Sequence, residues 1–293
     1  MTAWGLVTTV RASEAMIRVF VTHHLALGAT QLWLYFDDPD DPAFDAIAAI
    51  AGVVATRCSA QHWQTLAGMR PARIENRQTR NAQAAYGACT LPWLGHVDID
   101  EYLWPASPVA DVLDAVPPDV AMLRMEPFEA MQDADHPAAS PRLFRGPLKD
   151  RHAHLRAPVL GRFANVFPEA MLSHSVGKAL FRTHVAGLSP RLHGAFLNGV
   201  RLRGPAFSRD MVLLHCHTQD QAAWRAALEY RLTRGAYQYR PDLQSYLAAA
   251  DADELGHFYC ETQVLTREKQ ALLRGAGRLV EADLAAGPSA RRP

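Results

Sequence analysis

Hydrophobic and polar residues follow two alternating periods in the first hundred residues of the chain. Runs rich in β-branched and aromatic residues are typical of strands, and they are separated by stretches in which apolar residues recur every three or four positions, as on one face of a helix. Strands are expected at 6–10, 31–36, 53–58 and 94–103, and helices at 13–27, 44–51 and 72–88. This alternation predicts an α/β fold in which a mostly parallel sheet is flanked by helices.

The limits of the predicted elements carry their own signals. Ser13 offers a side-chain N-cap to the first helix, and Glu14 suits the positive helix start. Gly28 favours the left-handed conformation that ends a helix. An acidic turn over 37–42 closes the second strand. Single residues therefore mark the boundaries of the first predicted helices and strands.

The pattern is less regular beyond Trp104. A helix is expected at 109–116 and strands at 121–125, 178–183 and 211–216, whereas residues 131–175 show little periodicity, as in a functional loop or lid. From 219 onward the chain is mainly helical, with helices expected at 221–233, 242–250 and 253–273. We predict a domain over 1–218, a helical extension packed on it over 219–285, and a disordered tail over 286–293.

Composition narrows the class of protein. The 30 basic and 30 acidic residues balance, so no net field draws the chain to nucleic acid or to an anionic membrane. No apolar stretch reaches the roughly 20 residues that cross a bilayer, and the N-terminus does not read as a secretory signal. The 4 cysteines are far apart, which is typical of reduced thiols. We expect a cytoplasmic protein with no nucleic-acid partner and at most peripheral contact with the inner face of a membrane.

Three carboxylates, those of Asp98, Asp100 and Glu101, directly follow an apolar run. On a continuous strand Asp98 and Asp100 would point to one face. Like charges held side by side require a cation or a strong donor between them, and a hard divalent ion with oxygen ligands also holds a substrate phosphate. The plain alternative is a solvated acidic turn, which is the commoner case for an isolated Asp-x-Asp.

Chemistry-bearing residues also follow the first and second predicted strands, at 11–14 and 37–41, as the acidic group follows the fourth. Ligands of open parallel sheets bind beyond the carboxyl ends of the strands. The three segments are therefore predicted to line one crevice.

Four segments of the first half form a further pattern through their order and spacing. They are Val10-Arg11-Ala12-Ser13-Glu14, His23-His24-Leu25-Ala26-Leu27-Gly28, Leu34-Tyr35-Phe36-Asp37-Asp38 and Val97-Asp98-Ile99-Asp100-Glu101-Tyr102-Leu103. Together they resemble the family-2-like glycosyltransferases of the GT-A fold, in particular a bacterial branch of short enzymes. Residues 173–178, 190–194 and 213–216 match that branch more weakly. Ser13 and Cys216 depart from it, since the branch usually has Asn and an aromatic residue there.

The resemblance implies metal-dependent transfer of a sugar from a nucleotide-sugar donor to a saccharide or glycolipid acceptor, with inversion, in surface polysaccharide or glycolipid synthesis. The diphosphate leaving group gains negative charge, which Mn²⁺ or Mg²⁺ can stabilise. The implied metal ligands are Asp98, Asp100 and His215, and an imidazole ligand favours Mn²⁺ over Mg²⁺.

The residues expected to meet the nucleotide-sugar donor lie near the predicted strand ends or on the helix before the acidic group. They are Arg11, Asp37, Asp38, Arg77, Asn81, Asp98, Lys178 and Arg182. An aspartate can accept hydrogen bonds from the base or ribose, and basic residues complement phosphate. The plain alternatives are an ordinary turn for the aspartates and solvated surface positions for the others.

An inverting enzyme also requires a base that deprotonates the acceptor hydroxyl. Glu129 and Asp133 follow the strand at 121–125, where such folds usually place that base, and both are candidates. Two other hypotheses stay open: a degenerate nucleotide-sugar-binding scaffold, suggested by Ser13 and Cys216, and a phosphoesterase using the histidines. The second is disfavoured because His23 and His24 point apart on a predicted helix.

Overall fold

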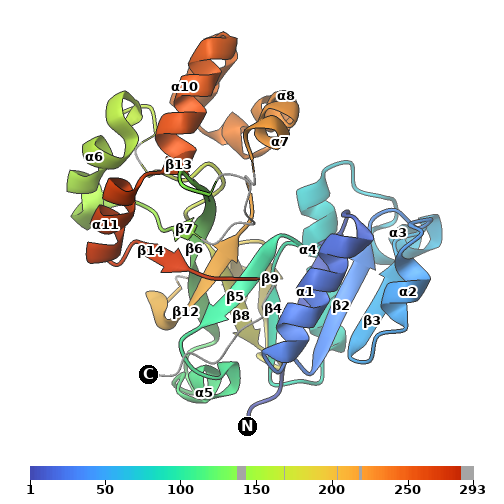
Figure 1. Ribbon diagram of the computed structural model, residues 1–293. Coiled ribbons are helices and arrows are strands. Elements are labelled where there is room, and N and C mark those ends of the chain that lie inside the picture. The colour runs from blue at the N-terminus through green and yellow to red at the C-terminus, as the bar shows by residue number, and fades with distance from the viewer. Residues whose placement is uncertain (137–142, 168, 203, 218–219, 285–293) are drawn as a thin grey trace. The chain divides into compact units, whose positions relative to one another are not determined.

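The computed structural model describes the chain except for residues 137–142, 168, 203, 218–219 and 285–293. The described residues form two compact units (Figure 1). The first unit contains residues 1–126, 177–213 and 284, and the second contains residues 127–176 and 214–283. Two long strands, β6 (Met122–Asp133) and β12 (Phe207–His215), contribute residues to both units.

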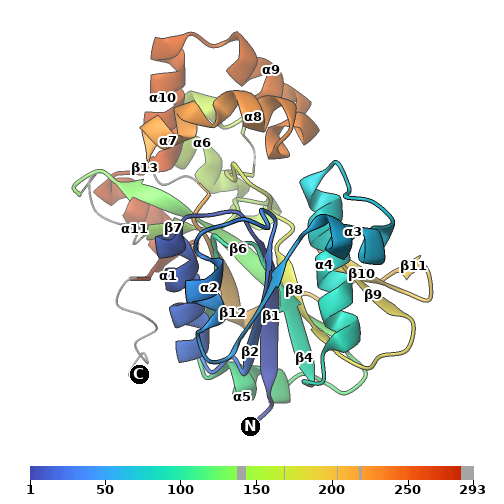
Figure 2. The same ribbon diagram turned by 90° about the vertical axis from the view of Figure 1, so that its right-hand side faces the viewer.

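A parallel sheet forms the centre of the first unit. Its parallel part runs in the order β4 (Trp93–His96), β1 (Trp4–Val10), β2 (Gln31–Phe36) and β3 (Val53–Arg57). Helices α1 (Glu14–Ala26) and α2 (Phe44–Ala48) cover one face, and α3 (Ala60–Ala67) and α4 (Ile74–Ala88) cover the other (Figure 2). The predicted α/β fold with a parallel sheet between helices is confirmed.

Small residues bring α4 close to the sheet. Ala82 and Ala85 are buried against Val7 and Trp33, whose side chains point to the same face because strand residues alternate. Ser13 caps α1 as expected, since its hydroxyl accepts a hydrogen bond from the backbone N–H of Met16. The periodicity of the sequence and the layers of this unit therefore agree.

Antiparallel strands extend the sheet on the β4 side. β8 (Lys178–Arg182) pairs with β4, and Met122–Met125 of β6 pairs with β8. β5 (Glu101–Pro105) pairs with β12 and is followed by α5 (Val109–Asp114). The predicted strands at 121–125, 178–183 and 211–216 are thus all present, two of them longer than the sequence indicated.

The single strand predicted over 94–103 is wrong. β4 ends at His96 and β5 begins at Glu101, and a turn lies between them in which the N–H of Glu101 donates to the carbonyl of Asp98 at 3.0 Å. Asp98 and Asp100 therefore belong to a turn at the carboxyl end of β4 and not to one face of a strand.

Two local elements have signals that the sequence analysis did not use. The Ser59 hydroxyl accepts from the N–H of His62 and caps α3, which was not predicted. A small three-stranded sheet contains β9 (Leu188–Arg191), β10 (Gly194–Leu197) and β11 (Val200–Arg201). Its last turn is Asn198-Gly199, with φ of 51° and 79°, the pair that two-residue hairpin turns favour.

The second unit combines short strands with helices. The end of β6 pairs with β7 (Leu143–Arg145) and β13 (Val264–Leu265), and β7 pairs with β14 (Leu279–Glu281). The helices are α6 (Arg156–Leu160), α7 (Gln221–Ala226), α8 (Leu228–Thr233), α9 (Pro241–Ala249), α10 (Ala252–Gln263) and α11 (Arg267–Gly275), with 3₁₀ turns at Asp150–Leu155, Gly161–Phe163 and Ala236–Tyr239. The predicted helix over 253–273 is interrupted by β13.

The core of this unit explains why residues 127–176 group with the C-terminal helices. Leu155, Leu160 and Phe163 pack in one apolar cluster with Trp224 and Phe258. The sequence analysis placed 127–176 in the domain over 1–218, because a segment without periodicity does not show its packing partner. The predicted tail over 286–293 lies outside the described residues. In the part of the chain that is described, no helix has the length and apolarity needed to cross a membrane.

Candidate functional site

The carboxyl ends of β1, β2 and β4 lie at one edge of the parallel sheet of the first unit, as predicted. The N–H of Asp37 donates to the carbonyl of Val10, and the N–H of Val97 donates to that of Val7, so the three chain segments leave the sheet side by side. Asp37 follows β2 directly, Arg11 follows β1, and Asp98 comes two residues after β4. Arg11 is exposed at this edge.

Asp37 forms a buried ion pair. Its side chain is 3% exposed, and Arg77 of α4 donates from Nε to Oδ1 at 2.7 Å and from Nη2 to Oδ2 at 3.0 Å. Arg70 donates to Oδ2 at 2.9 Å and is half exposed. This fork geometry is the strong form of an Arg–carboxylate pair. The carboxylate thus fixes two guanidinium groups at the strand end.

Asn81 lies one turn after Arg77 on α4 and is fully buried. Its amide donates to the Thr9 hydroxyl of β1 at 3.0 Å, and its Oδ1 is 3.0 Å from Nε2 of His62. The two residues predicted to share a helix face therefore do so, and that face contacts the sheet rather than solvent. Asp38, in contrast, is exposed and accepts from the N–H of Asp40, as in an ordinary turn.

A second ion pair lies after β4. Lys178, the first residue of β8, is 2% exposed and places its Nζ 2.8 Å from Asp98 and 3.5 Å from Glu101. Gln78 of α4 donates to the other oxygen of Asp98 at 2.7 Å, and Glu101 accepts from the N–H of Asp98. The like charges of Asp98 and Glu101 require a cation or a strong donor, and the ammonium group of Lys178 from β8 fills that role.

The electrostatics keep this pair ionised. Burial opposes the charge of Asp98, yet the charge and the hydrogen bond of Lys178, together with His96, hold the pKa of Asp98 below its usual value. Burial likewise opposes the charge of Lys178, but Asp98 and Glu101 raise its pKa. Burial, aided by Lys178, lowers the pKa of the adjacent His96 to about 4, so this imidazole is neutral at pH 7.

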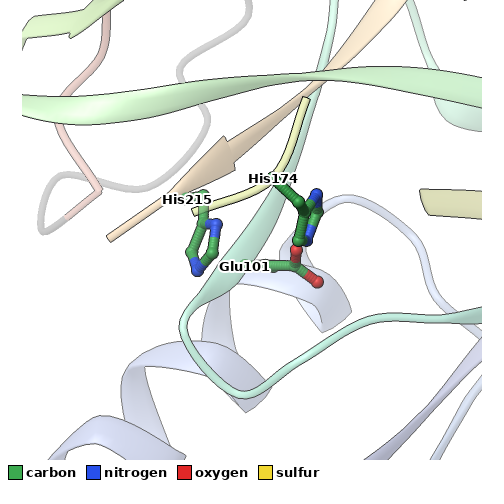
Figure 3. Close-up of side chains that lie close together, drawn as sticks. All are labelled: Glu101, His174 and His215. Carbon is green, nitrogen blue, oxygen red and sulfur yellow. The ribbon is translucent and has the colours of Figure 1, made fainter. Parts of the chain in front are cut away.

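Three potential metal ligands come close together: Glu101 begins β5, His215 ends β12, and His174 lies in an irregular segment before β8. Glu101, His174 and His215 each bring one ligand atom within 4.8 Å of the others (Figure 3). A carboxylate with two imidazoles is a donor set that suits Mn²⁺ and other first-row divalent ions. The residues present therefore fit the metal that the resemblance implies.

A third histidine, His217, lies next to His215. The ring centroids of His174 and His215 are 5.6 Å apart, and those of His215 and His217 are 5.3 Å apart. Burial, with the neighbouring charge of Arg231, holds the pKa of His217 well below its usual value. A neutral imidazole is the form that ligates metals.

Among the predicted metal ligands, His215 belongs to this group, while Asp98 is bonded to Lys178 and Gln78. Metal binding by Asp98 and Asp100 stays a prediction. The sequence analysis named neither Glu101 nor His174 as a ligand. Both lay in segments that it quoted, Glu101 in the Asp-x-Asp-Glu run and His174 in residues 173–178, and spacing alone did not connect them.

Arg182 and Lys178 were expected to act together, but the register of β8 separates them. Arg182 pairs with Trp93 at the amino end of β4, so it lies at the opposite edge of the sheet from Asp98. Its guanidinium donates to the carbonyls of Val116 and Val120 and stacks over Trp93, 4.5 Å from the ring centroid. Its environment is that of a structural residue.

The two candidate bases lie in the second unit. Asp133 ends β6, is partly exposed, and accepts from the N–H of Asp135 and from Gln270. Glu129 is 2% exposed, and its carboxylate accepts the backbone N–H groups of Leu172 and Ser173. Proton transfer by either residue stays a prediction.

His23 and His24 hydrogen-bond to backbone groups. Nε2 of His23 donates to the carbonyl of Leu103 at 2.9 Å, whereas Nε2 of His24 accepts from the N–H of Leu103 at 3.3 Å. Nδ1 of His24 donates to the carbonyl of Phe20, which fixes its neutral tautomer. Burial lowers the pKa of both rings. The His-His pair thus holds β5 against α1.

Comparisons with known proteins add one finding. No protein-family model matches the chain, and no curated protein matches it. Among solved structures, the chain is similar to the crystal structure of S. aureus TarS 1-349, with 9% sequence identity and a TM-score of 0.34. The similarity covers 94% of this chain and 79% of that one. At this TM-score and identity, the similarity does not indicate what the chain does.

Proposed function

We propose that the chain is a glycosyltransferase that moves a sugar from a nucleoside-diphosphate donor to an acceptor hydroxyl with the help of a divalent ion. The finer assignments, inversion and a saccharide or glycolipid acceptor in surface polysaccharide or glycolipid synthesis, come from the resemblance of the sequence motifs. One observation carries the proposal: the acidic turn after β4 and the buried Lys178 converge at the carboxyl edge of a parallel sheet.

The charge of this turn supports a divalent ion. Asp98, Asp100 and Glu101 bring three negative charges within four residues, and Lys178 offsets one of them. Two formal negative charges remain, which matches a divalent cation. Glu101, His174 and His215 would hold this ion, with Asp98 and Asp100 beside them as the resemblance implies. The bound ion would stabilise the charge that develops on the diphosphate as it leaves.

The other residues of the edge would bind and orient the donor. Lys178 lies where its ammonium can pass from Asp98 to a phosphate oxygen, because both are anionic oxygen acceptors. Asp37 holds Arg77 and Arg70, and the half-exposed Arg70 is the guanidinium of the two that can reach a ligand. Asp133, partly exposed at the end of β6, stays our candidate for the base that accepts the acceptor proton.

One observation favours a second candidate function, a scaffold of the same fold that binds nucleotide sugars without turnover. Lys178 and Gln78 already bond both oxygens of Asp98, so this part of the acidic turn is satisfied by the protein itself. A protein that never binds a metal would also be stable with this arrangement. Metal-dependent nucleotide binding and turnover therefore decide between the two.

The test is calorimetric titration of UDP, GDP and their sugars, with and without Mn²⁺. We expect one nucleoside diphosphate to bind only when Mn²⁺ is present, and Asp100→Asn to weaken this binding at least about tenfold, the scale of a lost metal contact. Release of nucleoside diphosphate from the sugar donor, measured on the same samples, reports turnover.

Asp119→Asn is the matched control, because Asp119 is an exposed aspartate next to β6, away from the acidic turn. It should bind as the unmodified protein does. Binding without turnover of any tested sugar would favour the scaffold. Absence of binding by every nucleotide with Mn²⁺ or Mg²⁺ would overturn both candidates.

A further inference from the structure

In the second unit, a short irregular segment leads to His174. This segment, residues 169–175, has no regular secondary structure, yet Ala170, Met171 and Leu172 are fully buried. Ala170 has a φ of 58°, a left-handed conformation that alanine seldom adopts. Buried backbone N–H and C=O groups must find partners, and this segment has no ladder or helix to supply them.

Two partners are backbone groups, since the N–H of Ala170 donates to the carbonyl of Phe167 and the N–H of Leu148 donates to the carbonyl of Glu169. Charged side chains supply others. The carboxylate of Glu129 accepts from the N–H of Leu172 at 2.7 Å and from the N–H of Ser173. The guanidinium of Arg240 donates to the carbonyls of Met171 and Ser173. These contacts fix the peptide groups on both sides of Ser173 and therefore the position from which His174 projects.

Two further groups complete the arrangement. Arg145 is fully buried and donates to the carbonyls of Ala170 and Thr262 at 2.5 and 2.6 Å. It lies directly opposite Glu129 in the β6–β7 pair, so the buried carboxylate has a buried counter-charge. Lys149 donates to the carbonyl of Ser175 at 3.0 Å, on the far side of His174.

We propose that Glu129 is a positioning residue, which fixes the backbone at Leu172 and Ser173 and so holds His174 in place for metal binding beside His215. Groups outside the ligand sphere commonly set ligand orientation, and their loss weakens metal binding. Glu129 does so through peptide groups, and it acts with Arg240. This role differs from proton transfer, for which an oxygen of Glu129 would have to reach the acceptor hydroxyl in place of, or beside, its amide partner.

The inference rests on the proposed metal-dependent function, so the experiment measures the metal first. Free Mn²⁺ is counted by electron paramagnetic resonance during titration of the full-length protein without nucleotide. In Glu129→Gln, one of the two N–H groups faces an amide NH₂ in place of an oxygen. We expect the Kd for Mn²⁺ to rise about 10- to 100-fold.

Arg240→Gln is a second variant, which acts on the same segment from a partly exposed position and leaves the buried Glu129–Arg145 pair intact. It should raise the Kd for Mn²⁺ in the same direction. Glu229→Gln and Arg225→Gln are matched controls in the same unit; Glu229 is exposed, and Arg225 donates to the carbonyl of Ala252 away from the segment. Neither should change metal binding.

A second readout separates positioning from general acid–base catalysis. If Glu129 acts through the metal ligand, saturating Mn²⁺ should return nucleoside diphosphate binding and turnover of Glu129→Gln toward the unmodified values. If it were the base, turnover would stay low at every Mn²⁺ concentration while metal binding was normal, and the inference would be overturned.

The failures of the two proposals are distinguishable. Unchanged Mn²⁺ affinity in both Glu129→Gln and Arg240→Gln, with normal binding by the unmodified protein, overturns the inference and leaves the proposed function standing. No Mn²⁺ binding by the unmodified protein overturns the metal-dependent function and the inference with it.

Discussion

Two regions of this protein hold their functional side chains by different means. In the parallel sheet of the first unit, the backbone of β1, β2 and β4 is satisfied by ladder hydrogen bonds, and Asp37 and Asp98 lie where the strands end. In the segment over 169–175 of the second unit, the backbone is satisfied by Glu129, Arg145 and Arg240. The backbone of the first region therefore depends on ladder hydrogen bonds and packing, whereas the backbone of the segment over 169–175 depends largely on buried charged side chains.

Each region is therefore sensitive to a different kind of substitution. A ladder shares its hydrogen bonds among many residues, so one altered side chain changes mainly the packing. A segment held by a few buried ionic groups loses several hydrogen bonds when one group is removed, and the remaining charge stays buried without its partner. The three predictions that follow separate these cases, beginning with the largest effect.

Arg145→Met should be the most destabilising change. It removes the donors to the carbonyls of Ala170 and Thr262 and leaves Glu129 without its counter-charge, so we expect a loss of about 3–5 kcal/mol in the free energy of unfolding. Denaturation in urea measures it. Arg225→Met, at a partly exposed arginine that donates to one carbonyl, is the control, expected to lose less than about 1 kcal/mol. Equal losses in the two variants would show that the buried charge has no special weight.

Gly95→Ala should break the first region through packing. A Cβ at Gly95 in β4 would lie 2.7 Å from Cδ2 of Leu6 and 3.0 Å from Cγ of Leu180, so we expect a loss of about 1–3 kcal/mol in the free energy of unfolding.

Gly87→Ala is the matched control for this change. Gly87 lies in α4, where a Cβ would meet no neighbouring side chain or strand within 4 Å, and alanine there should raise the stability by about 0.5–1 kcal/mol. An unchanged free energy of unfolding in Gly95→Ala would show that β4 and its neighbours shift to accommodate the methyl group, and it would contradict the prediction.

In the first region, too, one side chain holds backbone: His24 accepts from the N–H of Leu103. The pH dependence of the free energy of unfolding tests this contact. His24 is neutral in the fold, since burial lowers its pKa and its Nε2 accepts from the N–H of Leu103. The unfolded chain takes up a proton near the ordinary histidine pKa of about 6.5 and the fold does not, so stability is present above that pH and is lost as pH falls from there toward the folded pKa. One such histidine contributes a slope of at most about 1.4 kcal/mol per pH unit.

Denaturation between pH 7.5 and 5 measures this slope. His24→Gln should reduce it, whereas His257→Gln, at an exposed histidine, should leave it unchanged. His23 and His96 contribute in the same direction, because burial lowers the pKa of each. An identical slope in His24→Gln would exclude His24 as a source of the acid sensitivity.

The parts of the fold that were predictable depend on local patterns. The order of strands and helices from β1 to α4 follows from periodicity, apart from α3, and Ser13 and Gly28 mark the ends of α1. The run over 94–103 misled because its apolar residues continue through a turn, in which Asp98 pairs with Lys178 from a distant strand. The segment over 131–175 gave no prediction of helix or strand because its packing partners, such as Trp224 and Phe258, lie far along the chain at no regular spacing.

The candidate site divides in the same way. Asp37 and Asp98 were named from the sequence and lie at one edge, because the end of a strand is a local feature and parallel strands place their ends together. Lys178 was also named, and it lies at that edge because it begins β8, which is antiparallel to β4. Arg182 was named on the same grounds, but the antiparallel register of β8 places it at the other edge. The approach of His174 to His215 was not predicted, because it depends on a segment whose backbone Glu129 holds.

The α/β alternation and the positions of acidic residues just after strands follow from the amino-acid sequence alone, since both depend on the spacing of neighbouring residues. Which charges meet depends on the folded structure: Lys178 with Asp98, Arg77 with Asp37, and Glu129 with the backbone before His174. The physical reason is that a pairing between residues 40 to 80 positions apart depends on strand register and helix placement, which local periodicity does not encode.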